Sequence, residues 1–168
     1  MHSVLQLVRS RRREKDGFFL RAESYFNVAT QIEELDREPG GRKLIESYGG
    51  VSLHEQSHGE SFLALAVNRL GGQGFYLFDE PEAALSPTRQ LSLLKVIDVL
   101  ARKKQSQLII ATHSPILLAY PHATIYALDA NGIVAVPYES TEAYQLTRGF
   151  MLDRQRYLKH LFDDTEDD

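Results

Sequence analysis

A short apolar stretch that ends in two carboxylates constrains this chain more than any other feature. Residues 75–78, Phe-Tyr-Leu-Phe, follow a Gly-Gly-Gln-Gly turn and lead directly into Asp79 and Glu80. Such an apolar run is typical of a central parallel strand that is buried on both faces. Because ionised carboxylates are costly to bury without partners, Asp79 and Glu80 are expected at the carboxyl end of this strand, where open parallel sheets bind ligands.

Length and composition indicate one globular domain over residues 1–168, since 43% of the residues are apolar. The formal net charge of −4 gives no general electrostatic case for nucleic-acid binding. The absence of cysteine excludes disulfides and thiolate metal sites. No apolar run has the length of a membrane span, and the first residues lack the apolar core of a signal peptide. We therefore expect a cytoplasmic protein with no membrane contact.

A second strand is predicted to bring a histidine to the same place. Ser86 and Pro87 mark the start of a helix that should run to about Lys103, and an apolar strand over residues 107–112 then ends at His113. The order strand, helix, strand implies a right-handed crossover between parallel strands. Their carboxyl ends share one edge of the sheet, so His113 is expected near the carboxylates.

The remainder of the chain is predicted to be mainly helical, apart from one hairpin at Asn131-Gly132. The fold class is therefore α/β. The expected helices cover residues 1–16, 21–38, 42–48, 62–70, 141–150 and 153–161, and the expected hairpin strands cover residues 123–128 and 133–137.

The residues at the sheet edge fit metal-dependent hydrolysis of a phosphoanhydride. Asp79 can hold hydrated Mg²⁺ while Glu80 orients and deprotonates the attacking water, and a histidine nitrogen can contact a terminal phosphate. Residues 57–61 offer hydroxyls and backbone amides at the start of a helix, where anions bind. The simpler alternative for Asp79 and Glu80 alone is an acidic pair that caps a neighbouring helix.

On these residues the chain resembles the ATP-binding-cassette (ABC) type ATPases, in particular soluble ATPases of the AAA/ABC class related to DNA-repair and chromosome-maintenance proteins. Residues 76–81 resemble the Walker B strand, and residues 111–115, Ala-Thr-His-Ser-Pro, resemble the switch-histidine loop. Residues 57–61, Ser-His-Gly-Glu-Ser, are similar to the signature sequence, with glutamate in place of glutamine. Residues 84–86 are similar to the D-loop, with Ser86 in place of aspartate.

The resemblance implies a three-layer P-loop NTPase-like partial domain with a mostly parallel sheet, a β-hairpin and flanking helices. It implies ATP and Mg²⁺ as cofactors, with Asp79 as the metal ligand. Glu80 would be the catalytic base and His113 the γ-phosphate contact. Further contacts to ATP would come from the signature and the D-loop, namely Ser57, Gly59, Glu60, Ser61 and Ser86.

One motif of the family is missing. A phosphate loop of the form Gly-x-x-x-x-Gly-Lys-Ser/Thr occurs nowhere, and the nearest candidate, residues 40–43, lacks both the spacing and the hydroxyl. The chain therefore resembles the carboxyl-terminal part of a cassette, with a helical lead-in over residues 1–50, a core over 51–137 and a helical end over 138–168. Because signature sequences of this family act in trans, we expect a homodimer or a partner subunit that carries the phosphate loop.

Three functions follow from these features. The first is Mg-dependent ATP hydrolysis by a nucleotide-sandwich dimer, in which this chain alone is a weak or inactive ATPase. The second is a non-catalytic dimerisation or regulatory module that completes the ATP site of a partner. The third is a metal-dependent nuclease built on Asp79 and Glu80, although no further acidic cluster supports two metals. The process that ATP would drive, and DNA binding, stay open.

Overall fold

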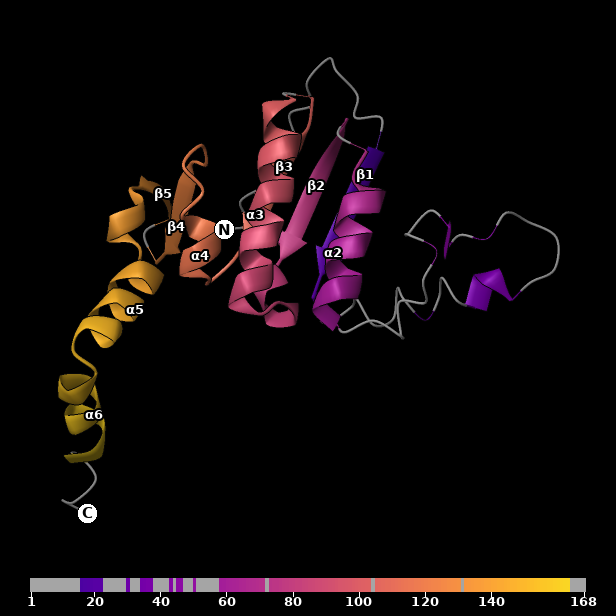
Figure 1. Cartoon of the computed structure of the whole chain (residues 1–168). Helices are drawn as coiled ribbons and strands as arrows, with labels where there is room; N and C mark the ends of the chain where they lie inside the picture. The colour runs from indigo at the N-terminus through magenta and orange to yellow at the C-terminus, as the bar shows by residue number, and fades with distance from the viewer. Residues whose placement is uncertain are drawn as a thin grey trace, which may run out of the picture.

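A computed structural model describes residues 16–22, 30, 34–37, 43, 45–46, 50, 58–71, 73–103, 105–130 and 132–163. Figure 1 shows the elements of this part of the chain. In order they are β1 (Asp16–Arg21), α2 (His58–Arg69), β2 (Gly74–Asp79), the 3₁₀ helix η2 (Pro81–Ala84), α3 (Pro87–Arg102), β3 (Gln107–Ala111), α4 (Pro115–Leu118), β4 (Ile125–Asp129), β5 (Gly132–Val136), η3 (Tyr138–Ser140), α5 (Glu142–Leu152) and α6 (Arg154–Asp163).

The centre of the fold is a parallel sheet in the order β1-β2-β3. The prediction that β2, α3 and β3 form a crossover unit is confirmed, and so is the mixed α/β class with its hairpin and flanking helices. The arrangement is that of a partial P-loop NTPase-like fold. Since β2 lies between two neighbours of the same direction, the carboxyl ends of all three strands lie along one edge (Figure 1).

The segment Asp16–Arg21 corrects the sequence analysis, which placed only helices within residues 1–50. It forms β1, and each residue pairs in parallel with β2, from Asp16 opposite Gly74 to Arg21 opposite Asp79. Burial alternates along it, with Phe19 exposed and Leu20 buried, which is the period of a strand. The helix predicted over residues 21–38 lies mostly outside the described residues.

Helices α2 and α3 cover one face of the sheet (Figure 1). Tyr76 and Phe78 of β2 point to this face, because side chains alternate along a strand, and both are fully buried. They pack in one cluster with Leu20 of β1 and with Leu93 and Ile97 of α3. Apolar burial between the sheet and these helices therefore holds β2 in place.

The opposite face of the sheet is apolar and open. Phe19, Leu77 and Ile109 lie in one row across β1, β2 and β3. Phe19 is 60% exposed and Ile109 is 49% exposed. Within the described part of the chain, β3 has no strand on its outer side. The described residues thus supply the sheet and one helix layer of the expected three-layer fold.

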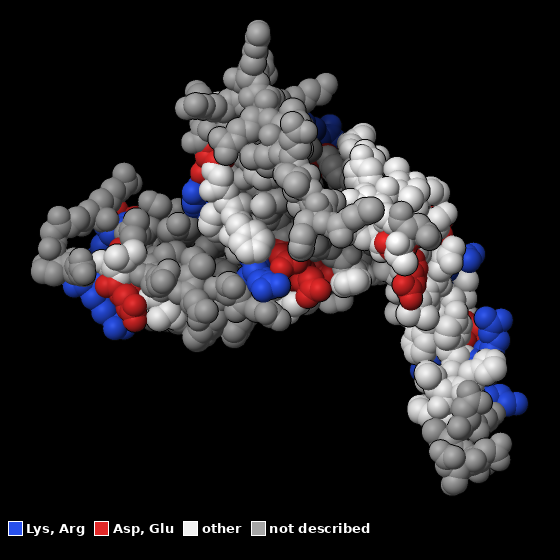
Figure 2. All heavy atoms as spheres, turned by 180° about the vertical axis from the view of Figure 1, so that it is seen from behind, with Lys and Arg blue, Asp and Glu red and all other residues white. Residues whose placement is uncertain are grey.

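The hairpin β4-β5 and the helices α5 and α6 follow the sheet domain and extend away from it (Figure 1). Their link to the sheet domain includes a hydrogen bond of 2.9 Å from the Tyr138 hydroxyl to the carbonyl of Pro115 at the start of α4. Figure 2 shows basic side chains along the helical arm, which carries Arg148, Arg154, Arg156 and Lys159. None of the described helices is long and apolar enough to cross a bilayer.

A polar cluster joins α3 to the segment after α4. The Asp98 carboxylate accepts hydrogen bonds from Arg102 (2.6 Å) and from the Tyr120 hydroxyl (3.1 Å). The bond from Arg102 is the main cause that lowers the pKa of Asp98 below its usual value. Burial is the main cause that raises the pKa of Tyr120. The cluster lies on the far end of α3 from the carboxyl edge of the sheet.

We expect Gly74→Ala to destabilise the fold by about 1–3 kcal/mol, because the added methyl group would overpack the start of β2. A Cβ atom at Gly74 would lie 2.6 Å from the backbone oxygen of Asp16 and 2.7 Å from the buried ring of Tyr76. Gly71→Ala is the control, since nothing lies within 4 Å of a Cβ there. Urea unfolding of both variants tests this, and equal midpoints would contradict the packing around Gly74.

Candidate functional site at the carboxyl edge of the sheet

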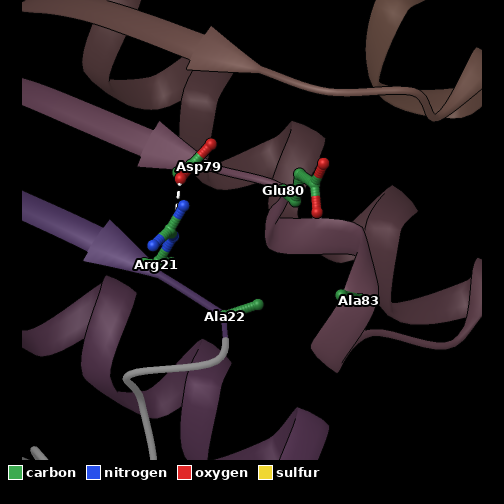
Figure 3. Close-up of a pocket in the computed structure, with 5 residues that line it drawn as sticks. All are labelled: Arg21, Ala22, Asp79, Glu80 and Ala83. Carbon is green, nitrogen blue, oxygen red and sulfur yellow. Dashed lines mark hydrogen bonds and ion pairs between the residues drawn. The ribbon is translucent and has the colours of Figure 1, made fainter.

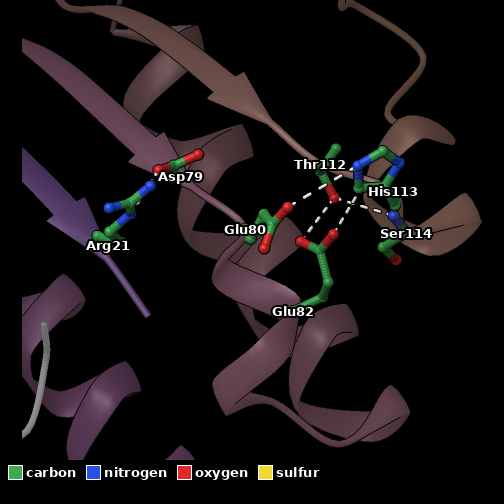
Figure 4. Close-up of polar contacts among 7 residues, drawn as sticks. All are labelled: Arg21, Asp79, Glu80, Glu82, Thr112, His113 and Ser114. Atoms are coloured by element: carbon green, nitrogen blue, oxygen red, sulfur yellow. Dashed lines mark hydrogen bonds and ion pairs between the residues drawn. The ribbon is translucent and has the colours of Figure 1, made fainter. Parts of the chain in front are cut away.

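The ends of β2 and β3 bring the candidate catalytic residues together. Asp79, the last residue of β2, pairs with Ala111, the last residue of β3. The amide of Glu80 donates a hydrogen bond of 2.9 Å to the carbonyl of Ala111, which extends the pairing by one residue. His113 follows Ala111 after one intervening residue. The adjacent carboxylates Asp79 and Glu80 thus leave the sheet at the same edge as His113, which is more than 30 positions away in the sequence (Figure 4).

Glu80 has a left-handed backbone conformation, with φ 47° and ψ 51°. This conformation is uncommon for any residue except glycine. The proline that follows Glu80 restricts its backbone further, because the residue before a proline favours an extended conformation. Strained backbones of this kind cluster at functional sites. Here the conformation turns the chain out of β2, and the Glu80 carboxylate lies 3.8 Å from Nε2 of His113 (Figure 4). Both side chains are open to solvent, at 54% and 90% exposure.

Asp79 is paired with an arginine that the sequence analysis did not identify. Nε of Arg21, at the end of β1, donates to Oδ2 of Asp79 at 2.8 Å. Arg21 and Asp79 line a small pocket together with Ala22, Glu80 and Ala83 (Figure 3). The pocket volume of about 70 Å³ leaves room for a few water molecules beside the carboxylates.

Glu82 lies in the 3₁₀ helix η2, two residues after Glu80. In the structure it faces the loop that follows β3 (Figure 4). One carboxylate oxygen accepts from the Thr112 hydroxyl at 2.7 Å, and the other accepts from the backbone amide of His113 at 2.6 Å. Glu82 therefore contacts the histidine loop and is not among the residues that line the pocket beside Asp79.

The signature-like residues lie partly outside the described residues. Ser57 is not described, and of His58 and Gly59 only the backbone at the start of α2 is. Since α2 runs antiparallel to β2, its start lies at the carboxyl edge of the sheet (Figure 1). Glu60 pairs with Arg89 of α3 at 2.9 Å, and Ser61 is buried.

Ser86 is placed where the sequence predicted, at the cap position before α3. Its side chain is exposed and makes no capping hydrogen bond to the helix. The hydroxyl is thus open at the same edge of the sheet as Glu80 and His113. The start of α3 is fixed instead by Gln90, whose side-chain amide donates to the carbonyl of Leu85 at 3.1 Å.

The donor set suits Mg²⁺ held jointly with phosphates better than a metal held by protein alone. Among the described residues, no three His, Cys, Asp or Glu side chains are grouped to hold a metal. Mg²⁺ usually keeps several waters and binds through one or two carboxylates together with substrate phosphates. Asp79 fits that role, although the contact from Arg21 occupies one of its oxygens.

The fold indicates the class of the protein. A three-stranded parallel sheet with an antiparallel hairpin and flanking helices is consistent with a partial P-loop NTPase-like fold. A family model described as "AAA domain, putative AbiEii toxin, Type IV TA system" matches residues 8–119, more than half of the chain. The chain belongs to this family of AAA domains, a class of nucleotide-binding, ATPase-like proteins. No curated protein and no solved structure matches it significantly.

Proposed function

We propose that this chain supplies the catalytic edge of an ATP-hydrolysing site, with Glu80 as general base, His113 as the contact to the γ-phosphate and Asp79 as the magnesium ligand. The observation that carries the proposal is the approach of the Glu80 carboxylate to Nε2 of His113, 3.8 Å apart, directly beside Asp79. A base and a phosphate contact must both reach the same reacting group, so their proximity at one edge is what such a reaction needs.

The environment of Glu80 suits a general base. Its side chain is more than half exposed, so that water can reach the carboxylate. The strained backbone holds the side chain beyond the end of β2, toward the histidine. His113 can donate a hydrogen bond to a phosphate oxygen from the opposite side. Mg²⁺, when bound by ATP and Asp79, would neutralise charge that develops on the phosphates.

The phosphate loop has to come from another segment or subunit, and the open side of the sheet supports this part of the proposal. All-parallel sheets are normally covered on both faces. Here Phe19 and Ile109 are exposed on one face, and the described residues give β3 no outer neighbour. A segment that carries a phosphate loop can pack on this exposed side of the sheet, beside Glu80 and His113. The ATP contacts predicted for Ser57, Gly59, Glu60 and Ser86 would then act in trans, across a dimer, whereas the buried side chain of Ser61 could not reach a nucleotide there.

A non-catalytic role is the second candidate, and the ion pair of Arg21 with Asp79 favours it. The arginine places a fixed positive charge, 2.8 Å away, against the proposed magnesium ligand. In such a site the Arg21 side chain, and not a metal ion, would neutralise the charge of the Asp79 carboxylate. In this case the chain would dimerise with, or regulate, a partner that holds ATP and performs the hydrolysis.

The test is Mg-dependent ATP hydrolysis by the native assembly, purified from the source cells through a tag on this chain, compared with the pure chain. We expect turnover by the assembly and little by the chain alone. Robust turnover by the pure chain would overturn the requirement for an added phosphate loop. An assembly that binds ATP but keeps its turnover without the Glu80 carboxylate would support the non-catalytic role.

A more specific prediction concerns Arg21. We expect Arg21→Gln to lower the Mg²⁺ concentration for half-maximal activity of the assembly several-fold, because the variant removes a cation that competes for Asp79. Arg102→Gln is the matched control, since it breaks an exposed ion pair, Arg102 with Asp98, outside the site. A Mg²⁺ titration of ATP hydrolysis measures the effect. A higher Mg²⁺ concentration for half-maximal activity in Arg21→Gln would contradict this prediction and show that Arg21 supports the metal site.

A further inference from the structure

We propose that Glu82 is a positioning residue that fixes the histidine loop, residues 112–114, against the turn that carries Glu80. The purpose of this contact, to keep His113 opposite the base, rests on the proposed function. The contact itself rests only on the geometry of the structure. Glu82 acts through its neighbours, since its carboxylate holds the main chain of His113 while Glu80 faces the imidazole (Figure 4).

Both oxygens of Glu82 are used in this contact. Oε1 accepts from the His113 amide at 2.6 Å, and Oε2 accepts from the Thr112 hydroxyl at 2.7 Å. Thr112 Oγ1 in turn accepts from the amide of Ser114 at 3.0 Å. Hydrogen bonds to a carboxylate are short and about twice as strong as neutral ones. One carboxylate thereby fixes, directly or through Thr112, three consecutive residues of the loop.

A second connection runs beside the first and is buried. The Ser114 hydroxyl donates to Oε1 of Gln90 at 2.5 Å, and Gln90 also holds the carbonyl of Leu85 at 3.1 Å. The same Ser114 oxygen accepts from the amides of Ile116 and Leu117, which caps α4. The histidine loop is thus tied to η2 through Glu82 and to the start of α3 through Gln90.

The turn between Glu80 and Glu82 is stiff. The contact of Glu82 with the histidine loop can therefore set the distance between Glu80 and His113. Glu80 and Glu82 are separated only by Pro81, which is buried and has a fixed φ. Glu82 lies in the 3₁₀ helix η2, closed by a hydrogen bond from Leu85 N to Glu82 O of 3.0 Å. Glu80 and Glu82 therefore move as one unit, and loss of the Glu82 contact frees His113 relative to Glu80.

The experiment is amide hydrogen exchange of His113, measured by NMR on the full chain without nucleotide. In Glu82→Ala we expect the exchange rate of this amide to rise roughly 10- to 100-fold, the loss of one hydrogen bond to a charged group. Glu82→Gln should restore part of the protection, because its carbonyl oxygen can still accept from His113. Glu139→Ala, an exposed carboxylate in η3, is the control, and the amide of Phe78 in β2 reports on global stability.

An unchanged His113 amide in Glu82→Ala would overturn the proposal, and so would equal acceleration at His113 and Phe78, which indicates general destabilisation. If Glu82→Ala does not fold, Thr112→Val removes only the hydroxyl, and we expect a smaller, local acceleration of exchange at the amide of Ser114; no change there would overturn the proposal.

No step of this measurement requires ATP, so its result is independent of the proposed ATPase. If the assembly hydrolyses ATP, Glu82→Ala should lower kcat and leave KM for ATP nearly unchanged.

Discussion

Glu80→Gln is expected to lower Mg-dependent ATP hydrolysis by the native assembly by at least about a hundredfold, the usual contribution of a general base. The amide cannot accept a proton from water. It keeps the size of the side chain and a carbonyl oxygen that can face His113, so the geometry of the edge should persist. ATP binding should be retained, because the proposal gives Glu80 no contact to the nucleotide other than through the attacking water.

The measurement compares steady-state hydrolysis and equilibrium ATP binding for assemblies that carry wild-type chain, Glu80→Gln or the control Glu139→Gln. Glu139 is exposed in η3 and is not among the residues assigned to the site, so its variant should behave as wild type. Retained turnover in Glu80→Gln would remove Glu80 as the base. Loss of ATP binding together with turnover would instead give Glu80 a role in holding the nucleotide or its metal.

The parts of this site that sequence reasoning recovered are those encoded locally. The apolar run before Asp79, the cap and proline at Ser86 and the apolar run before His113 each lie within a few residues. Their order then fixes a parallel crossover, because the handedness of such units is nearly invariant. The proximity of Glu80 to His113 follows from that topology, with no need to know any side-chain contact.

The parts that were missed depend on pairing between distant segments. Arg21 meets Asp79 across 58 positions of sequence, and it does so only because β1 is a strand beside β2. Residues 16–21 contain too few apolar positions for the spacing of apolar residues to distinguish a strand from a helix. The segment is a strand because it pairs with β2, which lies far away in the sequence. Glu82 and Thr112 are 30 positions apart. A carboxylate that accepts from a main-chain amide has no sequence pattern of its own.

Leu93→Ala is expected to have the largest effect on stability, a loss of about 2–5 kcal/mol in the free energy of unfolding. Leu93 is completely buried in α3, where it packs in the cluster of Tyr76, Phe78 and Leu20. The substitution removes apolar contacts and leaves a cavity at the centre of the only core that the described residues share. Such a loss is a large fraction of the stability of an ordinary domain, about 5–15 kcal/mol.

Leu91→Ala provides the matched control within the same helix, because Leu91 is 59% exposed and should change stability by no more than about 0.5 kcal/mol. Urea unfolding followed by circular dichroism measures both variants. Equal losses of stability would mean that α3 presents a different face to the sheet.

The Leu93 substitution also bears on the site, since Gln90 lies one turn before Leu93 and holds Ser114 of the histidine loop. A cavity at Leu93 should therefore loosen that loop before the chain unfolds, which hydrogen exchange at the amide of Leu117, a donor to Ser114, would detect.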